Sequence, residues 1–139
     1  YFQWMRDFLG YSPIAVMQQN SSIANPLYLK SGEAEPTLEH AKDSQVPLED
    51  SDLVLSLFNP RRYNQADASG YELEKFIDNT NGAFYYRSLK ILKSTYSESD
   101  IRCGLAFHGI TGTFKELPKV KEMENFDYNT LFTGDYFLK

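Results

Sequence analysis

Cysteine is nearly absent from this sequence, as are long apolar runs and any excess of positive charge. The single cysteine, Cys103, excludes an internal disulfide bond and is typical of a reducing compartment. No apolar run approaches the roughly 18–20 residues of a transmembrane helix, and no signal peptide is found. The net charge of −5 argues against a free-standing nucleic-acid binder, which usually carries a basic face. These absences predict a cytoplasmic chain with no membrane partner.

The composition is nevertheless that of a folded domain. The length of 139 residues suits a single domain, and 42% of the residues are hydrophobic, which is enough for a core. Ten tyrosines and ten phenylalanines make this core rich in aromatic rings, so global disorder is excluded. The neighbours of Cys103, residues 105–107 (LAF), indicate a cysteine buried in a strand rather than a reactive thiol.

The motifs of common catalytic and metal sites are missing as well. The sequence contains no GxxxxGK[ST], GxGxxG, CxxC or HExxH pattern. Its two histidines, His40 and His108, lie far apart without ligand-like spacing, so we predict no metal site. Glu49, Asp50 and Asp52 precede an apolar run and are by default a solvated strand entrance. The residues alone therefore support only polar groups at the ends of strands.

A helix and then a buried strand are predicted at the start of the chain. The apolar residues Phe2, Met5, Phe8 and Leu9 recur at helical spacing on one face. Residues 13–17 (PIAVM) form a continuous apolar run, which is typical of a strand buried on both faces of a parallel sheet. Polar residues 18–22 follow this run. Because ligands bind beyond the carboxyl ends of strands in open α/β sheets, this position is a candidate site.

The later segments predict mostly strands. Residues 52–58 (DLVLSLF) indicate a second buried strand, and residues 84–93 and 101–108 indicate a β-hairpin whose turn is 97–100. The remaining expectations are a polar mobile loop over 21–36, a short helix over 37–44, helical turns over 71–78 and a last strand over 113–117. Beyond Pro118, aromatic residues predict that the tail docks onto another surface.

The order of these segments resembles the second half of the motor domain of DnaB-like replicative helicases. Residues 13–20 (PIAVMQQN) match a strand of that family that ends in a glutamine, before a loop that faces DNA. Residues 35–58 match the next segment, in which Asp50 and Asp52 occupy acidic positions. Residues 88–118 match the hairpin that completes the family pattern. The specificity of the resemblance lies in the order of these motifs.

The resemblance implies a fold and a domain division. It implies an α/β chain with a partial RecA-like sheet, flanking helices and a C-terminal β-hairpin. Residues 1–118 would be the C-terminal half of a RecA-like ATPase domain, and residues 119–139 a C-terminal tail. The phosphate-binding loop and the acidic strand that holds Mg²⁺ lie upstream in this family. ATP and Mg²⁺ are therefore expected only in an intact parent protein, and the chain alone should expose a sheet edge that promotes self-association.

The resemblance also assigns roles to residues at the expected nucleotide site. Gln18 corresponds to the glutamine that senses the nucleotide state, where an amide can bond phosphate or the attacking water. Its alternative is a glutamine that merely ends a strand. Lys93 corresponds to a lysine that reaches the nucleotide of the neighbouring subunit, and its alternative is a solvated hairpin lysine.

The remaining expectations concern DNA. Asn20 and Lys30 lie in the loop that would face DNA, in which Lys30 is the only basic residue. Arg61 and Arg62 follow a strand and could meet DNA phosphates, a neighbouring subunit or solvent alone. The resemblance therefore implies single-stranded DNA and neighbouring copies in a ring as partners.

One position departs from the family pattern. The family places an arginine finger two residues after the lysine, but this chain has Thr95, which cannot replace a guanidinium charge. Either Arg87 or Arg102 substitutes, or hydrolysis is weak. The leading hypothesis is a piece of a ring-forming DNA helicase.

Two other hypotheses stay open at this point. One is a non-catalytic binding or assembly module that docks through its aromatic tail and basic loops. The other is an unrelated enzyme using Asp50 and Asp52 as an acid–base pair, although nothing in the sequence places these carboxylates in a cleft.

Overall fold

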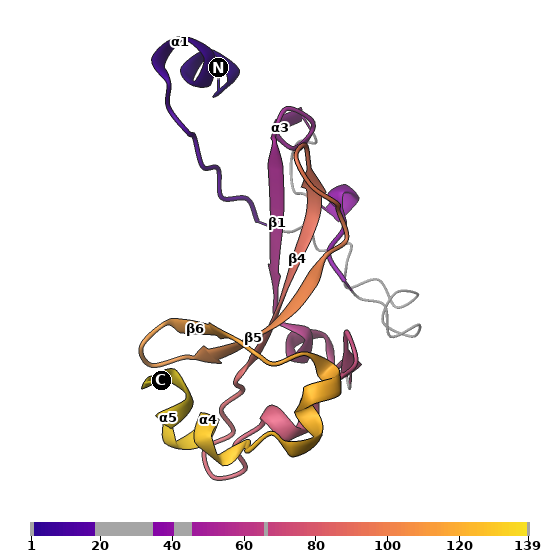
Figure 1. Ribbon diagram of the computed structural model, residues 1–139, viewed down its shortest axis with the longest axis vertical. Coiled ribbons are helices and arrows are strands. Elements are labelled where there is room, and N and C mark those ends of the chain that lie inside the picture. The colour runs from indigo at the N-terminus through magenta and orange to yellow at the C-terminus, as the bar shows by residue number, and fades with distance from the viewer. Residues whose placement is uncertain (1, 19–34, 41–45, 66, 139) are drawn as a thin grey trace.

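A four-stranded antiparallel sheet forms the centre of the structure, a computed structural model that describes residues 2–18, 35–40, 46–65 and 67–138. The strand order is β1-β4-β5-β6 (Figure 1). The strands are β1 (Leu53–Phe58), β4 (Tyr86–Ser94), β5 (Arg102–His108) and β6 (Thr113–Glu116). A small second sheet pairs β2 (Asp67–Ala68) with β3 (Tyr71–Glu72). Every strand pairing among the described residues is antiparallel, whereas the sequence predicted buried parallel strands.

Short helices accompany the sheet, so the mixed α/β class agrees with the sequence analysis. They are α1 (Phe2–Leu9), η2 (Leu38–His40), α3 (Val46–Glu49), η3 (Pro60–Tyr63), η4 (Leu73–Phe76), η5 (Val120–Asn125), α4 (Asn129–Thr133) and α5 (Asp135–Leu138). The helix predicted at the amino terminus is α1. The turns predicted over 71–78 are β3 followed by η4. Of the helix predicted over 37–44, η2 is observed, and residues 41–45 lie outside the described residues.

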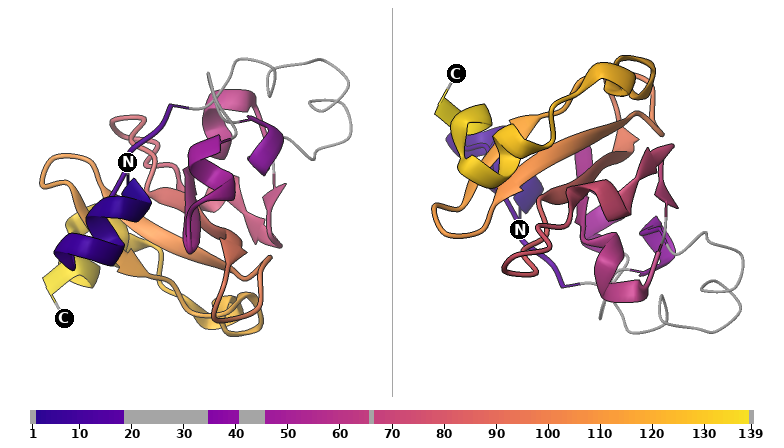
Figure 2. Two further views of the ribbon diagram at one scale, coloured as in Figure 1. Left: turned by 90° about the horizontal axis from the view of Figure 1, so that it is seen from above. Right: turned by 90° about the horizontal axis from the view of Figure 1, so that it is seen from below.

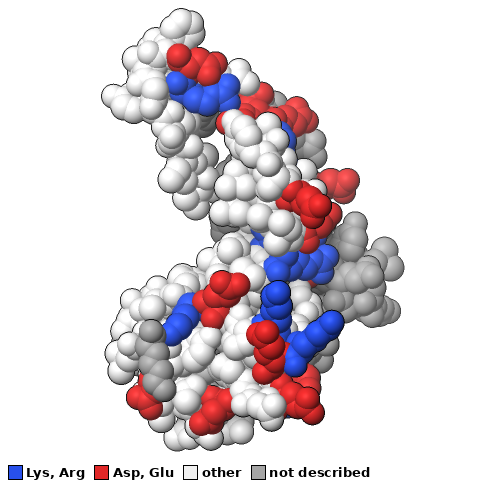
Figure 3. All heavy atoms as spheres, viewed as in Figure 1, with Lys and Arg blue, Asp and Glu red and all other residues white. Residues whose placement is uncertain are grey.

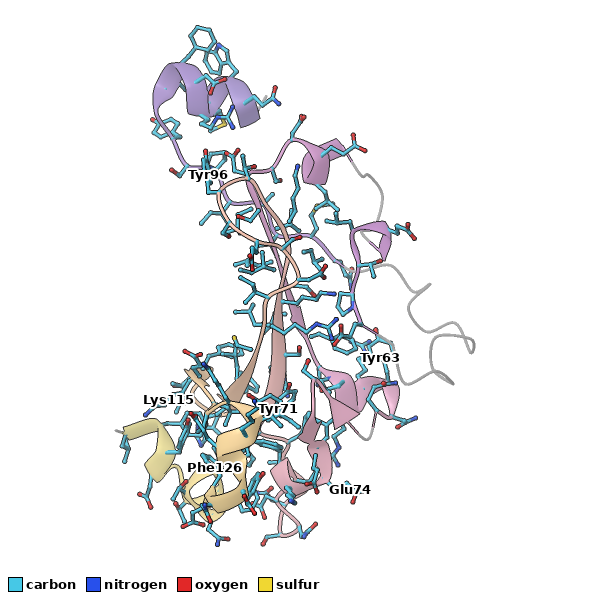
Figure 4. The ribbon with its side chains drawn as sticks, turned by 45° about the vertical axis from the view of Figure 1, so that its right-hand side comes forward. Tyr63, Tyr71, Glu74, Tyr96, Lys115 and Phe126 are labelled. Carbon is cyan, nitrogen blue, oxygen red and sulfur yellow. The ribbon has the colours of Figure 1, made fainter. Side chains whose placement is uncertain are left out.

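The predicted hairpin is confirmed. Strands β4 and β5 pair in register from Tyr86 opposite Ala106 to Lys90 opposite Arg102. The tip is held by the hydroxyl of Ser94, which accepts hydrogen bonds from the backbone amides of residues 96 and 97 at 3.3 and 3.1 Å. Figure 4 shows Tyr96 at this tip, far from the part of the molecule that holds Tyr71 and Phe126. The last predicted strand is also observed, as β6.

Strand β1 differs from the expectation of a strand buried on both faces. It lies at the edge of the sheet, and Leu53, Leu55 and Leu57 are each slightly more than half exposed. The alternate residue Phe58 is buried. This alternation follows from the two-residue period of a strand in a sheet with only one well-covered face.

The strand predicted over 13–17 is absent. Residues 10–18 form an irregular segment, in which Ile14 is 90% and Val16 is 95% exposed. A strand is stabilised by hydrogen bonds to a neighbouring strand and by cover on its faces, and no described residue supplies either for this segment. The segment connects α1, which lies beyond the Leu53 end of β1 and contacts it through the Arg6–Asp52 pair, to the remainder of the chain (Figure 1).

The core lies against the end of the sheet at which Tyr86 of β4 pairs with Ala106 of β5, and it is mostly aromatic. Tyr86, Phe76 and Leu131 are fully buried. The ring centroid of Tyr86 lies 5.2 Å from that of Phe76 and 5.3 Å from that of Tyr71. These distances are typical of favourable aromatic pairs.

The C-terminal tail returns to this core rather than projecting from it (Figure 2). Met123 and Leu131 are buried, and the tail aromatics pack against the core cluster: Phe126, Tyr128, Phe132, Tyr136 and Phe137. The prediction that the tail docks is thus confirmed, and the surface it docks on is its own chain. The aromatic rings that the assembly hypothesis offers to a partner thus pack against the core of their own chain.

The close approach of aromatic rings to β5 gives a test of this packing. A Cβ atom at Gly104 would lie 2.8 Å from the ring of Tyr71 and 3.0 Å from the ring of Tyr86. We expect Gly104→Ala to lower the free energy of unfolding by about 1–3 kcal/mol, the usual effect of overpacking. Gly109→Ala is the control because its nearest contact would be 3.8 Å, and its effect should stay within about 0.5 kcal/mol. Urea unfolding measures both, and equal effects would contradict the packing described.

The buried tyrosines make stability depend on alkaline pH. Burial is the largest cause that raises the pKa of Tyr86, and also that of Tyr71, above the ordinary tyrosine value. Because the folded pKa exceeds the unfolded value of about 10, the stabilising contribution is complete below that pH and decreases above it. We expect the free energy of unfolding to fall as pH rises beyond about 10, less steeply in Tyr86→Phe. Urea unfolding at several pH values above about 10 measures this dependence. If the free energy of unfolding fell equally steeply with pH in Tyr86→Phe and in the unmodified protein, Tyr86 would not be a source of the effect.

Candidate functional site

The expected nucleotide sensor, Gln18, is exposed at the end of the irregular segment 10–18. Gln18 therefore does not end a strand. Both interpretations of Gln18, as a nucleotide sensor and as a residue that merely ends a strand, had assumed that it does. Within the described residues, no hydrogen bond or ion pair joins Gln18 to Lys93, Arg61 or Arg62. The expected DNA-facing residues Asn20 and Lys30 lie outside the described residues.

Lys93 has a defined local environment on β4. It lies opposite Val54 of β1. Its Nζ donates hydrogen bonds to the backbone carbonyl oxygens of Leu48, at 3.2 Å, and of Glu49. A cation at the last carbonyls of a helix is favourable, because these groups have no partner within the helix. Lys93 is thus a structural link between β4 and α3 rather than a solvated hairpin lysine.

Arg61 and Arg62 both lie on η3 and are exposed. The Nη1 of Arg61 donates a hydrogen bond to the carbonyl oxygen of Gly82 at 2.7 Å, and its guanidinium lies over the ring of Phe84. Such contacts orient the guanidinium while leaving several of its five N–H donors available. These two residues are neighbours in the sequence, so their proximity is not a result of the fold.

The two arginines that could replace the finger at Thr95 are engaged elsewhere. The guanidinium of Arg87 lies 4.4 Å from the ring centroid of Phe107, and burial lowers the pKa of Arg87. Arg102 pairs with Glu35 at 2.9 Å. Because strands rise about 3.3 Å per residue, Arg87 lies about 26 Å along β4 from Thr95, and the partner of Arg102 in the sheet about 17 Å. Within this chain, neither arginine therefore lies near Thr95.

A different arginine reaches the Thr95 end of β4. The backbone amide of Thr95 donates a hydrogen bond to the carbonyl oxygen of Asp52 at 2.8 Å. The carboxylate of Asp52 in turn pairs with Arg6 of α1 at 3.0 Å, and Arg6 also pairs with Asp7. Sequence analysis missed this contact because Arg6 and Asp52 are separated by 46 residues. Arg6 thus pairs with two carboxylates, and all three side chains remain well exposed to solvent.

An ion-pair network that was not predicted from the sequence holds the segment at Glu35 against the hairpin. The carboxylate of Glu35 lies 2.9 Å from Arg102 and 3.7 Å from Lys90, whose Nζ lies 3.0 Å from Asp100. Lys90 is largely buried, so water screens its pairs less than it screens pairs at the surface. The network fixes the entry of residues 35–37 to the sheet.

The surface offers no deep cleft among the described residues. A shallow open pocket is lined by Ser69, Tyr71, Asp100, Arg102, Cys103, Lys119 and Val120. Within it, the hydroxyl of Tyr71 donates to the carbonyl oxygen of Pro118 at 2.8 Å. Burial is the main cause that raises the pKa of the Cys103 thiol, so little reactive thiolate exists at neutral pH. The pocket therefore supplies no activated nucleophile.

The remaining features of the described surface concern metal ions, membranes and the distribution of charge. Over the described ranges, no three His, Cys, Asp or Glu residues gather as metal ligands, and no helix has the length and apolar character needed to cross a membrane. Basic side chains on the face drawn in Figure 3 have acidic neighbours rather than forming a continuous basic patch. Asp50 is exposed and Asp52 is paired with Arg6, so these two do not form an acid–base pair in a cleft.

Comparison with known proteins gives no relative: no family model, no curated protein and no solved structure matches the chain.

The local role of Lys93 predicts a stability effect. Lys93→Met keeps the apolar stem but leaves the carbonyl oxygens of Leu48 and Glu49 without their donor. We expect the free energy of unfolding to fall by about 1.5–3 kcal/mol, the usual value for hydrogen bonds made by a charged group. Lys75→Met is the matched control because Lys75 only pairs with Glu72 at the surface, and its effect should be within about 0.5 kcal/mol. Urea unfolding compares them, and equal losses would refute the link.

Proposed function

We propose that the chain is part of the motor domain of a DnaB-like, ring-forming DNA helicase and supplies its hairpin that contacts the neighbouring subunit. One observation carries the proposal. Two of the segments that resemble the helicase family lie side by side in a single sheet, because β1 of residues 35–58 pairs with β4 of residues 88–118. This pairing joins residues that are 30 to 41 positions apart in the sequence, whereas the resemblance rests on the order of the segments along the chain.

The finer features of the proposal build on this sheet. The RecA-like fold would be completed by strands from outside the chain, which would pair with the open edge of β1. ATP and Mg²⁺ would be bound mainly by that other part. Lys93 would exchange its carbonyl partners for the nucleotide of a neighbouring copy, and Gln18 would sense that nucleotide. Asn20, Lys30, Arg61 and Arg62 would be the contacts with single-stranded DNA.

A second candidate, a non-catalytic assembly module, is favoured by a specific observation. The amino group of Lys93 is held by two carbonyl oxygens of its own chain, and neither Arg87 nor Arg102 lies near Thr95. Phosphoryl transfer depends on charges placed around the transferred group. A sheet that retains the hairpin but lacks these charges would assemble with a partner without hydrolysing ATP.

The source gene, read beyond the codons of this chain, separates the two candidates. The helicase proposal expects, in the same reading frame and before the Tyr1 codon, a GxxxxGK[ST] loop followed by an acidic strand. A frame that lacks both would leave the assembly module as the function.

The catalytic part of the proposal is tested on the intact parent protein. At a finger position, Thr95→Arg should raise the ATPase kcat by up to about 10³-fold. Lys93→Ala should lower kcat at least about tenfold while the ring still assembles. Lys75→Ala, on the distant η4, is the control and should change neither. Steady-state ATPase assays and sedimentation measure these effects, and a parent in which both hairpin variants behave as wild type would refute the proposal.

A further inference from the structure

The open edge of β1 is the largest unexplained feature of the described surface. Within the described residues β1 pairs only with β4, so no described strand pairs with the backbone N–H and C=O groups on its other side. Leu55 lies opposite Ile91 and Leu57 opposite Leu89. Residues directly opposite in an antiparallel pair share a face, so the exposed leucines extend an apolar sheet face up to this edge.

The edge carries few of the devices by which proteins prevent strands from pairing. The sequence of β1, LVLSLF, has no charged residue and no proline. One irregularity interrupts its register with β4, between Val54 and Leu55, and the pairing from Leu55 to Phe58 is regular. The irregular segment 10–18 does not cover the leucines, because Ile14 and Val16 are themselves almost fully exposed. Such an edge favours addition of another strand.

The charges at the two ends of β1 are of opposite sign. Glu49 and Asp50 are exposed just before the strand, and Arg61 and Arg62 are exposed just after it. The side chains of Asp50 and Arg62 have no ion pair within the described residues. An antiparallel copy of the same strand would place the acidic end of one β1 beside the basic end of the other. The strand is therefore complementary to itself in antiparallel orientation and not in parallel orientation.

We propose that β1 is the interface of a twofold symmetric dimer in which two copies of this chain join their sheets edge to edge. With the axis at Ser56, Leu55 of one copy lies opposite Leu57 of the other, and Asp50 lies at the same end as Arg62 of the partner copy. Such a contact satisfies the free backbone groups of both edges and shelters the leucines from water. A twofold contact is closed, so the assembly stops at the dimer rather than growing into a filament.

This inference is independent of the helicase proposal and concerns the chain as given. A strand from another part of a longer parent protein is the competing occupant of the same edge. The two occupants exclude one another, because each edge strand has only one open side. The experiments below therefore use the 139-residue chain itself.

Sedimentation-velocity ultracentrifugation over a wide range of concentrations tests the dimer. The unmodified chain is expected to sediment as a dimer that dissociates on dilution. Leu55→Lys places a charge on the edge at a half-exposed position and should raise the dimer Kd at least about tenfold. Ile110→Lys, at a residue 93% exposed in the turn between β5 and β6, is the matched control and should leave Kd unchanged.

Charge reversal tests the register and does not depend on the leucines. Asp50→Arg should weaken the dimer by bringing like charges together, and adding Arg62→Asp to the same chain should restore it. Far-ultraviolet circular dichroism verifies that every variant is folded. The proposal is overturned if the unmodified chain stays monomeric, if it forms larger rings, or if the double reversal does not recover affinity lost in the single one.

Discussion

The fold depends on the burial of one tyrosine, Tyr86, against the backbone of the neighbouring strand. Its ring is fully buried, and its hydroxyl donates to the carbonyl oxygen of Ala68 at 3.3 Å. Gly104 makes this possible because any side chain there would collide with the rings of Tyr71 and Tyr86. The same contact sets which face of β4 is inside, and the two-residue period of the strand then determines the environment of every other hairpin residue. The aromatic tail, from Phe126 onward, completes the cover of this face.

This arrangement leaves the sheet unevenly supported. The C-terminal helices and η4 cover the end of the sheet that contains Tyr86. The part of β1, β4 and β5 toward Tyr96 extends beyond them (Figure 4). There polar contacts hold the strands instead of a hydrophobic core. Glu35 forms ion pairs with β4 and β5, and Lys93 of β4 forms hydrogen bonds to α3. An apolar edge with little support from its own chain is free to receive another strand, which is why assembly follows from the fold more directly than catalysis does.

The sequence predicted what local patterns determine and failed where distant contacts decide. Alternation of apolar and polar residues predicted β4 and β5, because the two-residue period of a strand is visible in the strand's own sequence. The run over 13–17 is equally apolar, but a buried strand needs neighbours on both sides, and the described residues provide none. Arg6 with Asp52, and Glu35 with Arg102, are joined only by folding, so no spacing rule could have placed them. The tail was predicted to dock, but composition could not say on what.

The geometry bears differently on the two roles expected of the hairpin. The hydrogen bonds of the Lys93 ammonium to carbonyl oxygens and to a phosphate are all made by a charged donor and are worth about 1.5–3 kcal/mol each, and a phosphate adds the attraction of opposite charges, so an exchange of partners is feasible. Thr95 has no such remedy. A guanidinium would have to come from Arg87, which is stacked on Phe107, or from Arg102, which is paired with Glu35, and both lie well down the strands. Within the helicase proposal, hydrolysis is therefore the step with the least support from the described residues, and contact between subunits through the hairpin is the step with the most.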